Sequence, residues 1–161
     1  MRVALVLALL AFATGAQAAT PVRTCAQRAD TDSGNPVASP TPDDIFVGHR
    51  ILLAGGRTAG ALRNVESGRA GWWWFKSLAV VRRGRRVTIS IPPSFRDRLH
   101  LRYGRGREAQ TFAPCGDREW TYFPGGFLYT KAGCYAVDIR IDGRRAVRER
   151  FPLGVGATCA T

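Results

Sequence analysis

The stretch from residue 80 to residue 87 reads VVRRGRRV and places four arginines around a single glycine. The four are Arg82, Arg83, Arg85 and Arg86. Because a guanidinium group binds phosphate and carboxylate oxygens, the cluster is a candidate contact for an anionic polymer. The stretch also predicts a hairpin turn, because Val81 ends one apolar run, Val87 begins the next, and Gly84 suits a turn with positive φ. We therefore expect a solvated turn first and a ligand contact second.

Three consecutive tryptophans, Trp72, Trp73 and Trp74, form the second unusual stretch. Successive side chains of a strand point to opposite faces, so the three cannot all enter one core. Either Trp73 alone, or Trp72 together with Trp74, must point away from it. An exposed tryptophan often marks a binding surface. The alternative is that a neighbouring segment, such as residues 19–44, covers it.

No catalytic constellation is recognisable in the chain. Ser94, Asp97 and His100 lie within one short turn-and-strand segment, whereas a catalytic triad is normally assembled from separate elements. Asp117 and Glu119 flank an arginine, and we expect nearby arginines to be their partners. We therefore expect no enzymatic activity, no catalytic residues and no cofactor.

The four cysteines, Cys25, Cys115, Cys134 and Cys159, are an even number. No CxxC occurs and neither histidine lies near a cysteine, so no metal site of recognisable spacing is present. In an exported chain this pattern favours two disulfides. Three pairings are possible, and we favour Cys115–Cys134, which closes a local loop, together with Cys25–Cys159, which ties the N-terminal arm to the end of the chain.

The first residues predict export. Residues 1–18 read MRVALVLALLAFATGAQA, with one arginine, an apolar run and small residues before a cleavage point, as in a secretory signal peptide. The apolar run is shorter than the roughly 20 residues that span a bilayer. We expect a secreted, extracellular protein, which can associate with the cell wall and does not span the membrane.

Composition divides the rest of the chain into two parts. Residues 19–44 are rich in Pro, Ser, Thr, Asp and Gly, which predicts a flexible or extended arm. The run DTDSGN at 30–35 superficially resembles a calcium loop, but it lacks the downstream glutamate, and we expect no calcium there. Residues 45–161 are enough for one folded domain.

Alternating apolar and polar side chains predict strands at residues 87–91, 99–103 and 135–141. Further strands are expected near residues 46–53, 73–81, 110–114, 126–130 and 147–153. No segment after the signal peptide has the period of a helix. Eight or nine short strands separated by turn residues favour an all-β fold, an antiparallel β-sandwich.

The run from Gly133 to Val137 resembles the start of strand F in immunoglobulin-like sandwiches, where a tyrosine corner follows a glycine. Tyr135 fills the tyrosine position, and Val137 stands where antibody domains have their second core cysteine. This chain lacks the Cys-Trp-Cys core set, and Cys134 falls on the opposite face. The resemblance implies an immunoglobulin-like β-sandwich, in which a Cys115–Cys134 bridge would lie at a sheet end or on an outer surface.

A wider set of motifs resembles a known group of proteins. The motifs lie at residues 84–91 (GRRVTISI), 112–115 (FAPC), 123–127 (FPGGF), 133–135 (GCY) and 153–159 (LGVGATC). Together they resemble uncharacterised small secreted β-sandwich proteins of high-GC Gram-positive bacteria. That resemblance implies a sandwich with paired cysteines and implies no activity.

The formal net charge of +12 is carried almost entirely by arginine. A GC-rich genome accounts for this composition, and so does attraction to anionic surfaces. We expect an extracellular interaction or structural module that contacts a cell-envelope protein or glycan. The alternative is an arginine-mediated binder of anionic envelope polymers, with nucleic acid a weaker version because an exported protein rarely meets it. Salt separates the two, since polyanion binding weakens steeply as salt rises.

Overall fold

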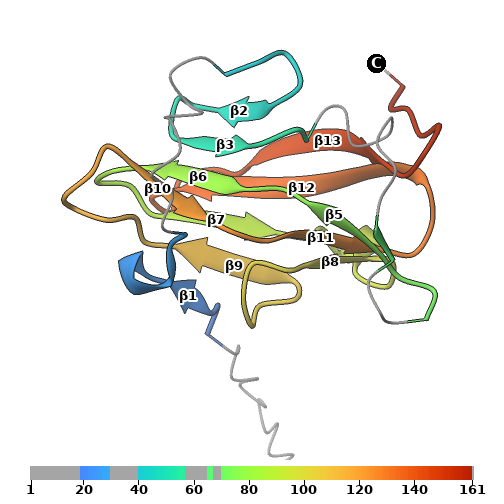
Figure 1. Cartoon of the computed structure of the whole chain (residues 1–161), viewed down its shortest axis with the longest axis horizontal. Coiled ribbons are helices and arrows are strands. Elements are labelled where there is room, and N and C mark those ends of the chain that lie inside the picture. The colour runs from blue at the N-terminus through green and yellow to red at the C-terminus, as the bar shows by residue number, and fades with distance from the viewer. Residues whose placement is uncertain (1–18, 30–39, 57–64, 67–69, 161) are drawn as a thin grey trace, which may run out of the picture.

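The structure is a computed structural model that describes residues 19–29, 40–56, 65–66 and 70–160, with the side chains of residues 65–66 excepted (Figure 1). The expected signal peptide and the run at 30–35 lie outside the described residues. The described residues form an all-β fold whose sheets are antiparallel apart from the β1–β9 pair, with two short 3-10 turns, η1 (Cys25–Gln27) and η2 (Pro93–Phe95). None of their helices is long and apolar enough to cross a membrane.

The strands fall into three hydrogen-bonded sheets. The first contains, in spatial order, β1 (Val22–Arg23), β9 (Ala109–Phe112), β7 (Val87–Ser90), β12 (Gly133–Ile141) and β13 (Val147–Leu153). The second contains β10 (Trp120–Phe123), β6 (Ala79–Arg82), β3 (Ile51–Leu53) and β2 (Ile45–Val47). The third contains β4 (Val65–Glu66), β5 (Trp73–Lys76), β11 (Gly126–Tyr129) and β8 (Leu99–Leu101).

The second and third sheets are two halves of one bent layer. Trp120 pairs with Arg82 in one half and Tyr129 pairs with Trp73 in the other, in the same antiparallel register. Between them, the N–H of Ser77 donates to the carbonyl oxygen of Gly125 at 3.0 Å. Figure 1 accordingly shows β5 and β6 as one run across the molecule, beside β10 and β11. The fold is therefore a sandwich of this bent layer and the five-stranded sheet.

Aromatic rings from both layers meet in the core. The ring of Phe127 in the bent layer lies 5.0 Å from that of Phe151 in the five-stranded sheet. Phe112 and Phe123 make a similar contact at 5.1 Å between β9 and β10. All four rings are fully buried, and such packing is the main favourable contribution to folding.

The predicted strands agree with the structure in position and differ in length. Residues 147–153 form β13 as expected, and the alternating run at 135–141 is the main part of β12. The run at 46–53 is instead a hairpin, β2–β3, because Gly48 and His49 both adopt positive φ and turn the chain. Trp120–Phe123 was not predicted as a strand, yet it forms β10.

The arginine-rich stretch is a turn, but not a hairpin turn. Gly84 adopts a φ of 75°, as expected. However, Arg82 at the end of β6 pairs with Trp120, whereas Val87 at the start of β7 pairs with Phe112 and Ile141. The stretch therefore crosses from one layer of the sandwich to the other. Local alternation cannot reveal this, because it predicts strands without predicting their neighbours.

The favoured disulfide pairing is wrong, although all four cysteines are bonded. The bridges are Cys25–Cys115 and Cys134–Cys159, and no free cysteine is present. β1 runs parallel to β9, which brings Cys25 to Cys115 just beyond both strands. β12 pairs with β13, which carries the end of the chain past Cys134. The start of the domain and its C-terminus lie on opposite sides of the molecule (Figure 1), so Cys25 cannot reach Cys159.

The described ends of the expected arm, residues 19–29 and 40–44, are attached to the sandwich. The amide of the fully buried Gln110 donates to the carbonyl oxygen of Pro21 at 2.7 Å. The guanidinium of Arg23 donates to the carbonyl oxygen of Pro124 in the opposite layer, also at 2.7 Å. Asp44 accepts a hydrogen bond from the N–H of Gly55. β1 thus forms one edge of the five-stranded sheet.

Candidate anion-binding site

Several loops gather at one end of the sandwich. The β6–β7 loop and the β9–β10 loop lie together at the left end in Figure 1. The N–H of Arg83 donates to the carbonyl oxygen of Glu119 at 2.8 Å, which joins these two loops. The N–H of Arg82 donates to the carbonyl oxygen of Arg50 at 2.9 Å, which adds the β2–β3 turn. We call this region the arginine end.

The first arginine of the RRGRR stretch is held by its neighbours. The guanidinium of Arg82 lies 3.2 Å from the carboxylate of Glu119 and 5.6 Å from the ring centre of Trp120. Both side chains of the ion pair are substantially exposed, so the pair contributes little to stability.

Asp142, in the turn between β12 and β13, organises the other half of the stretch. Its carboxylate accepts hydrogen bonds from the guanidinium of Arg85 at 2.6 Å and from the N–H of Arg86 at 3.0 Å. Its own N–H donates to the carbonyl oxygen of Arg86. The hydrogen bond from Arg85 is the main reason that the pKa of the Asp142 carboxyl lies below its ordinary value.

This carboxylate makes stability depend on pH in a defined direction. Because the pKa of Asp142 is lower in the folded state than in the unfolded chain, its contribution is complete above about pH 4 and is lost as the pH falls through the folded value. We expect Asp142→Asn to lower the free energy of unfolding at pH 7, and the gap from the unmodified protein to shrink at pH 3. Urea unfolding at the two pH values measures this, and a gap that widens at pH 3 would contradict the assignment.

A cavity of about 340 Å³ opens beside the Arg85–Asp142 pair. Three apolar side chains of β12 and β13 line it: Ile139, Ile141 and Val147. Its rim carries four arginines: Arg50, Arg85, Arg144 and Arg145. The single carboxylate at this rim is Asp142, and Arg85 already occupies it.

The arginine end therefore has an excess of positive charge. Arg50, Arg144 and Arg145 make no ion pair with any described carboxylate, and the same holds for Arg83 and Arg86. Like charges gathered around one opening repel each other, and a bound anion removes that repulsion. Guanidinium groups on a cavity rim suit phosphate and carboxylate oxygens. The arrangement is chemically suited to an anionic group.

No protein-family model, curated protein or solved structure matches the chain. No relative therefore indicates which residues are functional, and the candidate site is identified from its geometry alone. Sequence reasoning chose Arg82, Arg83, Arg85 and Arg86 but missed Arg50 and the pair at 144–145. The run DGRR at 142–145 repeats the glycine-and-arginine composition of RRGRR and was the signal that could have found that pair.

The tryptophans divide between the two faces of the bent layer. Trp73 lies on the same side of β5 as the core residue Phe75, but at the strand end, where it stays 43% exposed. Trp72 and Trp74 lie on the outer side. Trp72 stacks on the ring of His100 with centroids 4.4 Å apart and is nearly buried. The expectation that the three cannot share one core is confirmed, while their role in binding stays a prediction.

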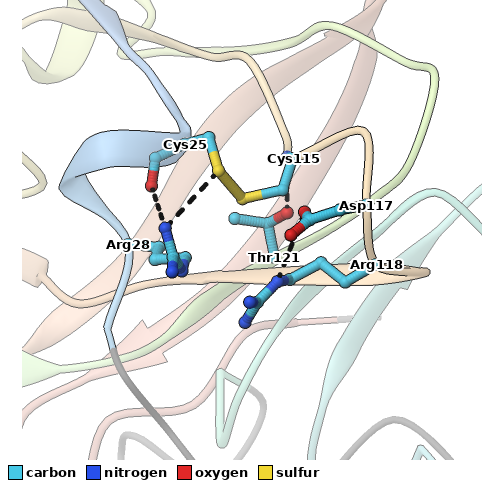
Figure 2. A network of polar contacts seen from close by, with 6 residues as sticks. All are labelled: Cys25, Arg28, Cys115, Asp117, Arg118 and Thr121. Atoms are coloured by element: carbon cyan, nitrogen blue, oxygen red, sulfur yellow. Dashed lines mark hydrogen bonds and ion pairs between the residues drawn. A yellow bond between two sulfur atoms is a disulfide. The ribbon is translucent and has the colours of Figure 1, made fainter.

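The Cys25–Cys115 disulfide lies among polar groups (Figure 2). Arg28 donates to the carbonyl oxygen of Cys25 at 3.3 Å, and its Nη1 lies 3.6 Å from the sulfur of Cys25. The N–H of Cys115 donates to the hydroxyl of Thr121 at 2.7 Å, and both of those residues are buried. These contacts fix the bridge at the base of the β9–β10 loop.

Asp117 lies close to the same bridge and pairs with Arg118 at 3.6 Å. Within the described residues, Cys25, Cys115 and Asp117 are the group whose ligand atoms lie near enough together to hold a metal ion. The two sulfurs are bonded to each other, so the carboxylate alone remains as a ligand. One carboxylate is too few for a stable protein metal site.

Of the three residues considered for a catalytic triad, two lie on different elements, and Asp97 lies between those elements in the chain. Ser94 belongs to η2, and His100 belongs to β8. The Nε2 atom of His100 lies 3.2 Å from the carbonyl oxygen of Arg96, and the imidazole ring stacks on Trp72. The absence of enzymatic activity stays a prediction.

Proposed function

We propose that the protein is an extracellular β-sandwich module that binds an anionic polymer of the cell envelope through its arginine end. One observation carries this proposal: four arginines and a single carboxylate line one cavity together with three apolar side chains, and that carboxylate is already paired. Of the two functions left open by the sequence, the arginine-mediated one is therefore favoured.

Two further features support an extracellular setting. Two disulfides in a domain of this size are compatible with an oxidising compartment. The signal peptide expected at residues 1–18 would direct the chain to such a compartment. The anionic polymers of such a setting are wall polymers and lipid headgroups, which carry repeated phosphate or carboxylate groups.

The binding residues act through charge more than through shape. A polyanion that contacts several arginines releases the small cations that previously screened its charge. The logarithm of its association constant therefore falls linearly with the logarithm of the salt concentration. The apolar lining of the cavity adds a salt-insensitive contribution if a sugar or glycerol carbon of the polymer lies against Ile141 or Val147.

The test uses poly(glycerol phosphate) as the probe and compares two double variants. We expect Arg144→Gln with Arg145→Gln to reduce the salt dependence of binding by about 1.4 to 1.8 logarithmic units per tenfold change in salt, because each phosphate contact contributes about 0.7 to 0.9. The matched control, Lys131→Gln with Arg150→Gln, removes the same charge from exposed positions outside the cavity rim.

Binding isotherms at several salt concentrations measure the effect. The control should retain most of the slope of log affinity against log salt concentration. Both variants should keep the melting temperature of the unmodified protein. An equal reduction of the salt dependence in the two variants would show that net charge alone attracts the polymer. It would contradict the proposed binding site. Salt-independent binding would instead favour the aromatic contact with a protein or glycan, for which the exposed Trp73 is the candidate.

A further inference from the structure

A second cationic depression lies at the other half of the bent layer. It has a volume of about 460 Å³ and forms where the chain leaves β8. Four basic side chains line it: His100, Arg102, Arg105 and Arg107. Leu128 of β11 contributes an apolar wall, and no acidic residue lines it. We call it the β8 pocket.

Two of these basic side chains are supported by the tryptophan run. The guanidinium of Arg102 lies over the ring of Trp74, 4.5 Å from its centre. The ring of His100 lies nearly parallel to that of Trp72, with 18° between the planes. Leu128 pairs with Trp74 on one side and with His100 on the other, so these side chains share the outer face of the sheet. Stacking on a fixed aromatic ring restricts the guanidinium of Arg102 and the imidazole ring of His100 to one orientation each.

The positive charge of the β8 pocket has no acidic counterpart within it. The carboxylate of the neighbouring Glu108 lies 3.0 Å from the guanidinium of Arg96, outside the pocket. Arg105 and Arg107 pair with no described carboxylate. Three guanidinium groups that line one depression repel each other, and this arrangement is relieved when an anion binds between them.

We propose that the β8 pocket binds a phosphate group, and that Trp72 and Trp74 are positioning residues for it. A phosphate carries up to two negative charges and three or four oxygens, so it can accept hydrogen bonds from several guanidinium groups at once. A carboxylate offers two oxygens and one charge, so it compensates less of the triple positive charge and accepts fewer hydrogen bonds than a phosphate. The tryptophan run then acts through Arg102 and His100 and does not need to touch the ligand.

This inference is independent of the arginine end. Trp74 and Arg82 are eight residues apart on the continuous β5–β6 run, which corresponds to about 26 Å at the rise of an extended strand. No residue lines both the β8 pocket and the cavity at the arginine end. Either site can therefore fail its test without affecting the other.

The experiment titrates the purified protein with inorganic phosphate and, separately, with glycerol phosphate, at low ionic strength. Isothermal titration calorimetry measures affinity. Fluorescence of the four tryptophans is compared between the unmodified protein and Trp74→Phe, so that the difference reports on Trp74 and its stacked Arg102. Saturation by inorganic phosphate assigns the free ion, and saturation by glycerol phosphate alone assigns a phosphate ester. The absence of saturation by either, or the same response to sodium chloride, overturns the proposal.

Variants distinguish the β8 pocket from general attraction. We expect Arg105→Gln with Arg107→Gln to weaken phosphate binding by about 100-fold or more, because each removes a charge-assisted hydrogen bond. Lys131→Gln with Arg150→Gln removes the same charge from exposed positions outside both cavities and should leave phosphate binding unchanged. If the second pair weakens binding as much as the first, the phosphate binds elsewhere and the proposal fails.

The positioning role of the tryptophan needs a separate comparison. Trp74→Phe keeps an aromatic ring beneath Arg102, whereas Trp74→Leu removes it. We expect phosphate affinity to fall about tenfold in the leucine variant and to be largely restored in the phenylalanine variant, at unchanged melting temperature. Equal affinity in the two variants would contradict the positioning role.

Discussion

Replacing both Cys25 and Cys115 by alanine should lower the free energy of unfolding by about 4.6 kcal/mol. The two cysteines are 90 residues apart, so their bridge closes a very long loop. A cross-link of this span removes a large amount of conformational freedom from the unfolded chain, and the loop-entropy relation gives the value above. The bridge also holds β1 at the edge of the five-stranded sheet, where only two residues pair with β9. Urea unfolding of the purified variant measures the loss.

The second bridge provides the matched control. Cys134 and Cys159 are 25 residues apart, and the same relation predicts a loss of about 3.5 kcal/mol for their double alanine variant. Peptide mapping without reduction should recover Cys25 joined to Cys115 and Cys134 joined to Cys159. Recovery of a Cys115–Cys134 peptide would contradict the structure, and so would a larger loss from the shorter loop.

Replacing Gly126 by alanine should destabilise the protein by about 4 kcal/mol or more, the range that marks a disrupted backbone contact. Gly126 begins β11 with a φ of 154°. A Cβ atom there would overlap the carbonyl oxygen of Phe75 on the paired strand, well inside the shortest contact that real Cβ atoms make. Because the obstacle is backbone, no side-chain rotation relieves it, and β5 must separate from β11.

Gly84→Ala is the control for this effect. Gly84 has a φ of 75°, but a Cβ atom there would meet nothing within 4 Å. The cost is then limited to the left-handed conformation itself, about 1 to 2 kcal/mol. Thermal and urea unfolding of the two variants compare the effects directly. A larger loss at Gly84 than at Gly126 would show that the β6–β7 turn, and not the β5–β11 contact, limits the fold.

The sequence by itself determined the class of the fold and much of the strand pattern. Alternation over residues 135–141 reflects a strand with one buried face, and β12 buries Tyr135, Val137 and Ile139 on that face. The hydroxyl of Tyr135, which follows Gly133 as in a tyrosine corner, donates to the carbonyl oxygen of Lys131 at 2.6 Å, while the immunoglobulin-like identity of the sandwich stays a prediction. These properties are local, so they can be read from spacing and residue type.

The alternation of apolar and polar side chains does not predict which strands pair with each other. The apolar run at 73–81 forms β5 and β6, which pair with β11 and β10 in one register that continues across Ser77. The sequence pattern did not predict this pairing. Nor did RRGRR show that its two flanking strands belong to different layers. Alternation specifies which side chains are buried, but many pairings of short strands bury the same side chains, and only their joint packing selects one of them.

Both candidate sites show the same division. The sequence determined that arginines are abundant, that Trp72 to Trp74 cannot share one core, and that four cysteines in this setting form two bridges. Tertiary structure alone decided that Arg50 and Arg145 meet at one rim, that Trp74 lies under Arg102, and which cysteines pair. The physical reason is that charge and alternation belong to the chain locally, whereas a site or a disulfide depends on distances between residues that pairing and packing bring together.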